Sequence, residues 1–333
     1  MALPVALTLL LRLANPLGVW AAEPLRYPAA RTAMEAGGAD NVYLIWTTPA
    51  ATLDQLALEC IGSVVSLYQE HVFLFANNLT VADLENVSWG KANLVHYDPT
   101  DVLQGTPLAS WFTEKREELS RGKFYFSHLT DMLRIALVYT YGGAYFDADV
   151  LALRRLNPHH INRLVRYRND SDFFETAVIY FSPGHPFLFA AMKLITRSYN
   201  PDNWISAGPG ALTDTYNAIA GNQYIRRPGQ VYPGVWLGLR LSKARAFWEE
   251  GVLQHSDFIG CEAIHLWGSV VRGYLRSVST DSEFGYLNSP EQRRRVTERI
   301  ATLRNLTVCV DYISELRRSS RHVDRRRQLR QLL

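Results

Sequence analysis

Two carboxylates, Asp147 and Asp149, end an apolar segment that begins directly after Gly142 and Gly143. Alternate residues of a strand point to the same side, so a strand continuing through Leu153 presents both carboxylates together. Two adjacent carboxylates are costly to bury unless a cation lies beside them. Oxygen ligands of this kind suit Mn²⁺ or Mg²⁺, which substrate phosphates often share. The pair therefore predicts a divalent-cation site, with Asp149 as the main ligand and Asp147 as a less direct one.

The segment before this pair predicts a helix that positions it. Apolar residues recur there at helical spacing and define one inward face: Leu129, Met132, Leu133, Ala136, Leu137 and Thr140. Ser127 is a suitable N-cap, and Gly142 with Gly143 ends the helix, since glycine adopts left-handed φ without penalty. Asp131 and Arg134 stand three residues apart and share a face. Taken alone they indicate a surface ion pair, but next to the two carboxylates they favour a functional role.

Seven residues form one pattern: Asp131, Arg134, Gly142, Gly143, Tyr145, Asp147 and Asp149. This Asp-x-x-Arg and Gly-Gly-x-Tyr-x-Asp-x-Asp combination resembles the signature of DXD sugar-transfer enzymes. Within that group the chain is similar to the α1,4-glycosyltransferases of the lactosylceramide 4-α-galactosyltransferase type, over roughly residues 41–274. The resemblance implies an α/β fold of the GT-A type, with a Rossmann-like mixed sheet flanked by helices in a single catalytic domain.

The resemblance also implies an activity. It is the Mn²⁺-dependent or Mg²⁺-dependent transfer of galactose or an N-acetylhexosamine from a UDP-sugar to a glycolipid or glycan, with retention and an α1,4 linkage. Asp131 is expected to bind donor-sugar hydroxyls and Arg134 to lie near the diphosphate. Gly142, Gly143 and Tyr145 belong to the same donor-binding signature. His265, on the apolar segment 263–267, is expected to contact the metal or the diphosphate, although a lone histidine there is more often a core residue.

Segments that alternate between strand and helix patterns supply the scaffold. Residues 42–46, 71–75 and 92–96 predict strands and 53–68 a helix, which together indicate a parallel sheet with ligands beyond its carboxyl ends. Thr47, after the first strand, is then expected to face the nucleotide. Gly208 and Gly210 begin a predicted helix over 211–220, where the family has a matching site segment. The strand 177–181 follows Glu175, in the place where the family usually has Asn-Gly. Glu175 is either an acceptor-side carboxylate or an exposed strand-end acid.

Composition bounds the organisation of the chain. Its 333 residues, 47% hydrophobic, are enough for one large catalytic domain with a real core. We expect a targeting segment over 1–22, a stem over 23–40, the catalytic domain over 41–280, a helical extension over 281–316 and a basic tail over 317–333. The tail holds seven Arg and one Asp, so the net charge of +3 becomes −3 for residues 1–316. The body is therefore not expected to bind nucleic acid.

The N-terminal apolar run is short and broken, and it favours a signal peptide or a weak signal-anchor. Four sequons, at Asn78, Asn86, Asn169 and Asn305, indicate entry into the secretory route, and the resemblance implies the Golgi lumen with membrane association. The three cysteines allow one disulfide of undetermined pairing.

Two alternative functions remain. One is a phosphatase of the haloacid-dehalogenase type. Such enzymes need a second acidic pair later in the sequence, and this chain has no Asp-Asp after Asp149. The other is a non-catalytic luminal glycan-binding protein on the same scaffold.

Overall fold

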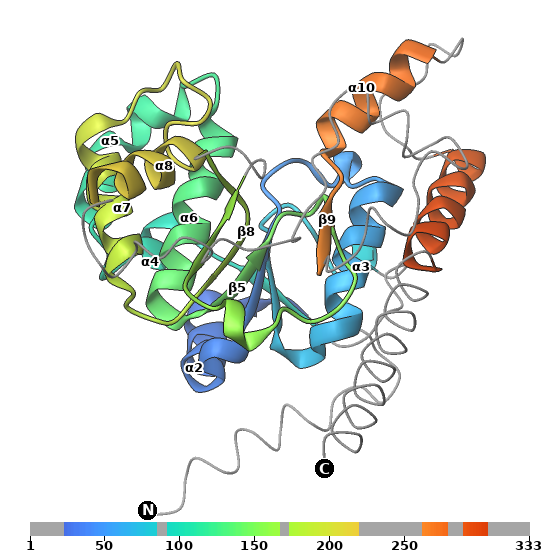
Figure 1. The fold of residues 1–333 in the computed structure, drawn as a ribbon, viewed down its shortest axis with the longest axis horizontal. Coiled ribbons are helices and arrows are strands. Elements are labelled where there is room, and N and C mark those ends of the chain that lie inside the picture. Colours follow the sequence, from blue (N-terminus) through green and yellow to red (C-terminus); the bar gives the residue numbers. More distant parts are fainter. Residues whose placement is uncertain (1–22, 85–91, 167–172, 220–261, 279–288, 306–333) are drawn as a thin grey trace, which may run out of the picture.

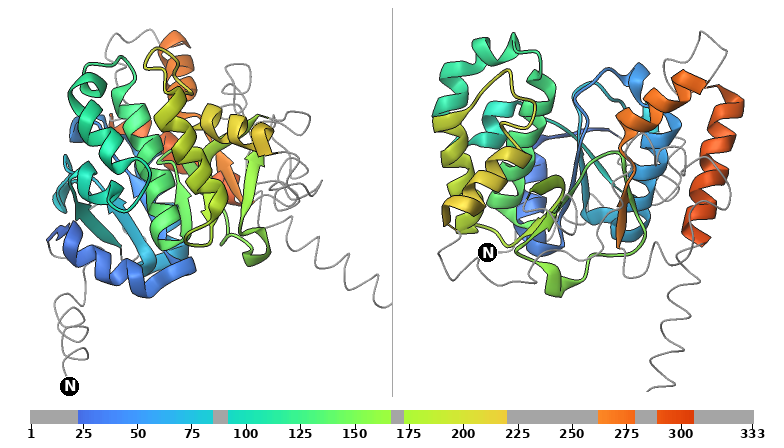
Figure 2. Two further views of the ribbon diagram at one scale, coloured as in Figure 1. Left: turned by 90° about the vertical axis from the view of Figure 1, so that its left-hand side faces the viewer. Right: turned by 45° about the horizontal axis from the view of Figure 1, so that its top comes forward.

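The computed structural model describes residues 23–84, 92–166, 173–219, 262–278 and 289–305. Among these residues a seven-stranded mixed sheet, in the order β1-β4-β3-β2-β5-β8-β7, lies between two groups of helices (Figure 1). A second sheet pairs β6 with β9. The two further views show the same layered arrangement (Figure 2). This architecture confirms the predicted α/β class with a mixed sheet flanked by helices.

Parallel pairing dominates one half of the large sheet. Its parallel strands are β1 (Leu25–Arg26), β4 (Asn93–His96), β3 (Val72–Phe75), β2 (Val42–Ile45) and β5 (Gly143–Phe146). Beyond β5 the pairing becomes antiparallel, through β8 (Phe174–Phe181) and β7 (Arg163–Arg166). The sheet therefore confirms the predicted parallel strands and their order along the chain.

Helices cover both faces of the sheet, and the side chains of β2 show why. Tyr43 and Ile45 join the core under α6 (Tyr125–Tyr141), whereas Val42 and Leu44 join the core under α3 (Gln55–Tyr68). Alternate residues point to opposite faces, so a strand apolar at every position needs cover on both sides. The other helices are α2 (Tyr27–Gly37), α4 (Pro99–Leu103), α5 (Ala109–Ser120), α7 (Pro186–Ser198), α8 (Pro209–Ile219), α10 (Gly268–Val278) and a helix over 290–305.

The predicted N-cap of α6 is wrong. The helix begins at Tyr125, so Ser127 is its third residue. The N–H of Tyr125 already donates to the Gly122 carbonyl and that of His128 to the Phe124 carbonyl, which makes the hydrogen bonding helical before Ser127. The predicted end is confirmed, since Gly142 at φ +71° follows the last residue, Tyr141. The N–H of Gly142 donates to the Val138 carbonyl and closes the last turn.

The strand predicted to carry both carboxylates is also wrong. β5 ends at Phe146, a turn contains Asp147 and Asp149, and a separate strand β6 (Val150–Ala152) follows. The N–H of Val150 donates to the Asp147 carbonyl and closes this turn. β6 leaves the large sheet and pairs with β9 (Ala263–His265) in the smaller one. The carboxylates consequently share a side because of the turn and not because of strand periodicity.

Two further boundaries moved. The predicted strand 177–181 begins three residues earlier in β8, which brings Glu175 into the sheet. The predicted strand 263–267 stops at His265, because Trp267 takes a left-handed φ of +53°. The helices predicted over 53–68 and 211–220 are confirmed within two residues at each end, and the predicted helical extension contains a helix over 290–305.

Several predictions fall outside the described residues. These are the targeting segment 1–22, the basic tail 317–333, Cys261, Cys309 and the sequons at Asn86 and Asn169. Cys60 is buried in α3 and forms no disulfide. Among the described residues, every helix is too short or too polar to cross a membrane.

Candidate active site

The candidate site lies where two neighbouring parallel strands end. β2 and β5 pair in parallel, with Tyr43 opposite Tyr145, so Thr47 and Asp147 both follow the carboxyl ends of their strands. β2 connects through α3 to β3 on one side, whereas β5 lies on its other side. A reversal of this kind leaves a crevice at the carboxyl edge, and ligands of open α/β sheets bind there.

Asp147, Asp149 and His265 converge at this edge. Each offers one ligand atom, and the three atoms lie within 4.8 Å of one another. The Asp147 and Asp149 side chains are 24% and 26% exposed, so both carboxylates remain open to a ligand. Two carboxylate oxygens and an imidazole nitrogen are a donor set that suits Mn²⁺. These residues therefore fit a divalent cation.

Asp149 and His265 are joined by several contacts. The Nε2 atom of His265 lies 3.4 Å from Oδ1 of Asp149, and the backbone N–H of Gly268 donates to Oδ2 over 2.8 Å. Burial raises the pKa of Asp149, but the imidazole and the Gly268 N–H outweigh burial and hold the pKa below its usual range. Burial also lowers the pKa of His265, and the Asp149 carboxylate more than offsets it. The Nδ1 atom of His265 is buried with no hydrogen-bond partner among the described residues.

Arg134 holds Asp147 in place from α6. Its Nη1 atom lies 2.9 Å from Oδ1 of Asp147 and donates to the Thr176 carbonyl, also over 2.9 Å. The guanidinium stacks over the Tyr145 ring at 4.6 Å, and the Tyr145 hydroxyl donates to Oδ1 of Asp147 over 2.6 Å. Arg134 is only 6% exposed. Its guanidinium therefore orients a cation-site carboxylate, and the ion pair with Asp131 is buried rather than on the surface.

Asp131 lies in the second turn of α6, enclosed by its neighbours. One oxygen is 3.4 Å from Arg134 Nη2 and accepts a hydrogen bond from the Thr176 hydroxyl over 3.3 Å. A Cβ atom at Gly208 would lie 2.3 Å from this carboxyl group, so only glycine lets the segment before α8 approach it. Burial raises the pKa of Asp131 to about 7. The geometry gives Gly208 a defined role against Asp131.

The remaining glycines of the signature serve close backbone approach. A Cβ at Gly143 (φ +95°) would lie 2.2 Å from the Asn41 carbonyl oxygen, and one at Gly142 would lie 2.6 Å from Pro183. Both lie at the start of β5, at the opposite end of the strand from Asp147. The N–H of Gly210 donates to the Ile205 carbonyl over 2.9 Å. The structure thus does not bring Gly142 and Gly143 together with the two carboxylates.

Glu175 is a buried carboxylate on β8, 7% exposed, which rules out the exposed strand-end interpretation. Burial raises the pKa of Glu175 to about 7. His265 lowers that pKa and Asp147 and Asp149 raise it, so Glu175 lies within electrostatic range of all three. A carboxyl group with a pKa near neutrality, facing a cation site, has the properties of a proton acceptor.

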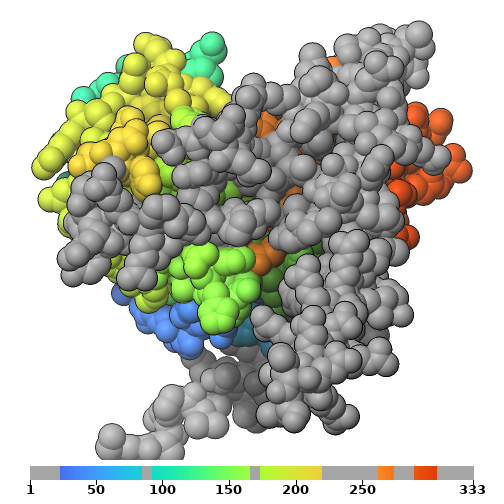
Figure 3. Space-filling model, viewed as in Figure 1, coloured from blue at the N-terminus to red at the C-terminus, as the bar shows by residue number. Residues whose placement is uncertain are grey.

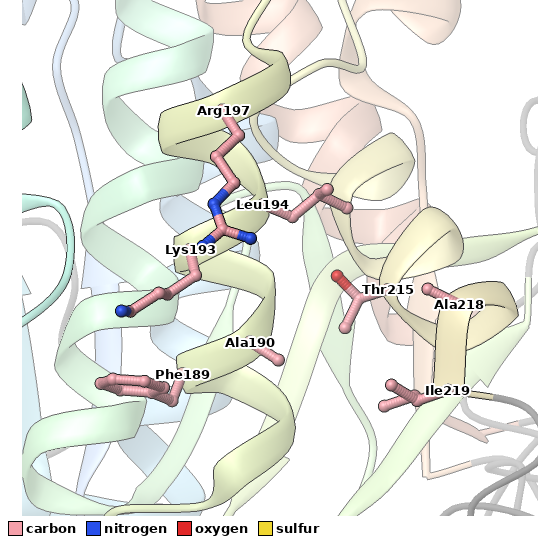
Figure 4. A pocket seen from close by; sticks show the side chains of 8 residues that line it. All are labelled: Phe189, Ala190, Lys193, Leu194, Arg197, Thr215, Ala218 and Ile219. Carbon is pink, nitrogen blue, oxygen red and sulfur yellow. The ribbon is translucent and has the colours of Figure 1, made fainter.

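A cavity of about 330 Å³ lies elsewhere, between α7 and α8, and its lining includes none of the predicted site residues (Figure 4). Phe189, Lys193 and Arg197 reach it from α7, and Thr215 and Ile219 from α8. These two helices form one flank of the molecule in the space-filling view (Figure 3). The chemistry-bearing side chains gather at the sheet edge and not in this cavity.

Sequence reasoning missed three contributors to the site. Thr176 contacts both Arg134 and Asp131, and Gly268 binds Asp149 through its backbone. Arg272 lies one turn into α10 and pairs with Asp54. The presence of a glycine directly after the predicted strand 263–267 was the only sequence feature that could have indicated a backbone contact at Gly268. Nothing in the local sequence pattern indicated a role for Arg272 or Asp54.

Comparison with known proteins gives matches to glycosyltransferase families over the region that contains the candidate site. Residues 60–174 match the family model described as glycosyltransferase sugar-binding region containing DXD motif, and residues 180–287 match the alpha 1,4-glycosyltransferase conserved region. The chain is 30% identical to human alpha-1,4-N-acetylglucosaminyltransferase over 116 residues, which are 35% of this chain and 32% of that protein. It is 29% identical to mouse lactosylceramide 4-alpha-galactosyltransferase over 120 residues, 36% of this chain and 32% of that protein.

The chain thus spans about a third of the length of these curated relatives. Among solved structures it is similar to the PaToxG glycosyltransferase, with a TM-score of 0.42, 13% identity and coverage of 84% of this chain and 94% of that one. The two family matches follow one another and together extend over about two thirds of the chain. These matches confirm the resemblance to the DXD-containing glycosyltransferases and, within them, to the α1,4-glycosyltransferases.

Proposed function

We propose that this protein transfers a hexose, galactose or an N-acetylhexosamine, from a UDP-sugar to a glycolipid or glycan acceptor. The transfer requires Mn²⁺ or Mg²⁺, retains the anomeric configuration and forms an α1,4 linkage. The observation that carries this proposal is the convergence of Asp147, Asp149 and His265 at the carboxyl edge of the sheet, in a chain that resembles this family.

Asp149, Asp147 and His265 are the residues that would hold the cation. A bound Mn²⁺ or Mg²⁺ supplies positive charge that stabilises the diphosphate as a leaving group. Arg134 and the Tyr145 hydroxyl orient the Asp147 carboxylate through charge-assisted hydrogen bonds. The nucleotide lies over the ends of β2 and β5, beside Thr47, and Asp131 forms the wall of the sugar site with Gly208.

In this proposal Glu175 acts on the acceptor, which its burial near the cation-site residues supports. The acceptor hydroxyl gives its proton to the Glu175 carboxylate while its oxygen bonds to the anomeric carbon, and the bond from that carbon to the diphosphate oxygen breaks. A base whose pKa is about 7 is half ionised near neutral pH, which suits proton transfer at that pH. None of the described residues stands out as a covalent nucleophile, so attack from the face of the departing UDP accounts for retention. Gly210 and the start of α8 flank the acceptor side.

A donor panel tests the proposal. UDP release from UDP-galactose, UDP-N-acetylglucosamine and UDP-N-acetylgalactosamine is measured with Mn²⁺, with Mg²⁺ and after chelation. We expect one donor to be hydrolysed or transferred in a metal-dependent manner. Asp149→Asn removes that turnover, whereas Asp40→Asn, at an exposed position in a 3₁₀ turn, leaves it intact. Metal-dependent turnover that survives in Asp149→Asn contradicts the assignment.

One alternative is a glycan-binding protein without turnover, suggested by Phe174-Glu175-Thr176 standing where the family has Asn-Gly. Saturable binding of glycans with no UDP release from any donor, in Mn²⁺, would favour it. The same panel separates the two functions, because only an enzyme releases UDP.

The proposed location is the secretory pathway, in the Golgi lumen and associated with its membrane. Two sequon asparagines that the structure describes, Asn78 and Asn305, are exposed, as glycosylation requires. A mobility shift of the secreted or membrane fraction after treatment with an N-glycosidase tests this location. The domain boundaries at 41–280, 281–316 and 317–333 remain predictions and are tested by limited proteolysis.

A further inference from the structure

An ion pair between the buried Asp54 and the partly buried Arg272 links the start of α3 to α10. The Nε atom of Arg272 donates to Oδ2 of Asp54 over 2.5 Å, and Nη2 donates to Oδ1 over 2.8 Å. Asp54 is fully buried, and it also caps α3 by accepting the Ala57 N–H over 3.1 Å. This two-pronged arrangement is specific to the planar guanidinium of arginine, because lysine offers only a point charge.

The same arginine packs against the backbone that binds Asp149. A Cβ atom built at Gly268 would lie 2.6 Å from Nη1 of Arg272 and 3.2 Å from Cβ of Asp149. Gly268 is therefore enclosed between the two side chains. Its N–H donates to Oδ2 of Asp149, and the Leu266 N–H donates to the Asp149 carbonyl over 2.9 Å. Gly268 thus connects Arg272, by packing, with the Asp149 carboxylate, by a hydrogen bond.

α3 supports the other side of the site as well. The Ser63 hydroxyl oxygen accepts the N–H of Ala152 on β6, over 2.8 Å. Val150, the first residue of β6 and the residue after Asp149, pairs with His265 on β9. Asp149 precedes β6, which Ser63 ties to α3, and His265 precedes α10, which Asp54 ties to the start of α3.

A purely stabilising role does not require this arrangement. The N-cap contact to Ala57 uses Asp54 alone, and apolar groups of similar volume often replace a buried ion pair without loss of stability. The two-pronged pair has a directional geometry that an apolar contact lacks. It is formed one turn into α10, a helix that begins directly after Trp267, which takes a left-handed φ.

We propose that Asp54 and Arg272 are positioning residues that set the geometry of Asp149 and His265 for a divalent cation. The inference rests on the proposed function and names residues for which none of the matched family descriptions supplies a role. In this proposal they act through Gly268 and through the start of α10.

Arg272→Lys is the main test, because it keeps the positive charge and removes the two-pronged contact. Arg155→Lys is the matched control. Arg155 also contacts α3, donating to the Leu67 carbonyl over 2.7 Å and stacking over the Tyr68 ring. Among the described residues, it forms no hydrogen bond or ion pair with the segment 262–278. The Kd for Mn²⁺ is measured by isothermal titration calorimetry without donor, and folding is followed by circular dichroism and Tm.

We expect Arg272→Lys to raise the Kd for Mn²⁺ about tenfold or more, the range seen when groups behind metal ligands are changed. Arg155→Lys keeps the wild-type Kd even if its Tm falls. In donor hydrolysis, Arg272→Lys raises the Mn²⁺ concentration needed for half-maximal rate, and saturating Mn²⁺ restores most of kcat. A neutral pair, Asp54→Asn with Arg272→Gln, gives a second folded variant with the same weakened Mn²⁺ binding.

An unchanged Mn²⁺ Kd in folded Arg272→Lys, with wild-type binding that Asp149→Asn abolishes, overturns the positioning role and leaves the proposed function standing. Equal loss of Mn²⁺ binding in Arg272→Lys and Arg155→Lys also overturns it, since general loosening of α3 then explains both. Wild-type protein that binds no Mn²⁺ overturns the proposed function and this inference with it.

Discussion

Replacing Glu175 by glutamine probes the electrostatics of the candidate site without metal or substrate. Glu175 is buried on β8, and burial raises the pKa of its carboxyl group from 4.5 to about 7. Glutamine has nearly the same shape and keeps the hydrogen-bonding ability, but it does not ionise. The variant therefore removes one titration from the folded state and leaves the packing of β8 in place.

The sign follows from proton linkage. The unfolded chain releases this proton near pH 4.5 and the folded protein near pH 7, so between these values the folded state binds more protons. The Glu175 contribution to the free energy of unfolding is thus unfavourable at high pH and develops as the pH rises from about 4.5 to about 7. A shift of roughly 2.5 pKa units corresponds to about 3 kcal/mol.

We expect Glu175→Gln to match the wild type in stability at pH 4 and to exceed it at pH 8 by up to about 3 kcal/mol. Guanidinium unfolding at pH 4, 6 and 8, in the presence of a chelator, measures the difference. Glu291→Gln, at an exposed position on the helix over 290–305, is the control and should follow the wild type throughout. A difference that stays constant from pH 4 to pH 8, or one that grows toward low pH, refutes the electrostatic reasoning.

The remaining predictions concern the residues around Asp147. Arg134→Met leaves two carboxylates without their buried counter-charge, and we expect a loss of about 3–5 kcal/mol in guanidinium unfolding; a loss below 1 kcal/mol contradicts the buried pair. Gly208→Ala places a methyl group against Asp131 and should cost about 1–3 kcal/mol, whereas Gly273→Ala, with open space around it, should not. Tyr145→Phe removes the hydrogen bond to Asp147 and should cost about 1–2 kcal/mol and weaken Mn²⁺ binding in calorimetry. Unchanged values for both quantities would show that this hydroxyl does not support the carboxylate.

Local sequence patterns determined much of the scaffold. The helix before Gly142, the strands at 42–45, 72–75 and 93–96, and the parallel arrangement all follow from apolar periodicity and glycine stops. The pattern of Asp131, Arg134 and the two later carboxylates also predicted a family that the comparisons support. These features depend on neighbours within a few turns of chain, where period and turn chemistry are strong.

Only the tertiary structure decided how the site is assembled. The split between β5 and β6 depends on pairing with β9, more than a hundred residues later, and periodicity within 144–153 carries no trace of that partner. The burial of Glu175 depends on the strands and helices around β8, and the Arg272 contact with Asp54 joins residues 218 positions apart. The sequence alone determined which residues supply the carboxylate, guanidinium and imidazole groups of the candidate site. Their distances and degree of burial depend on contacts between distant segments, because the interaction energy of charges varies with separation and with the water that packing excludes.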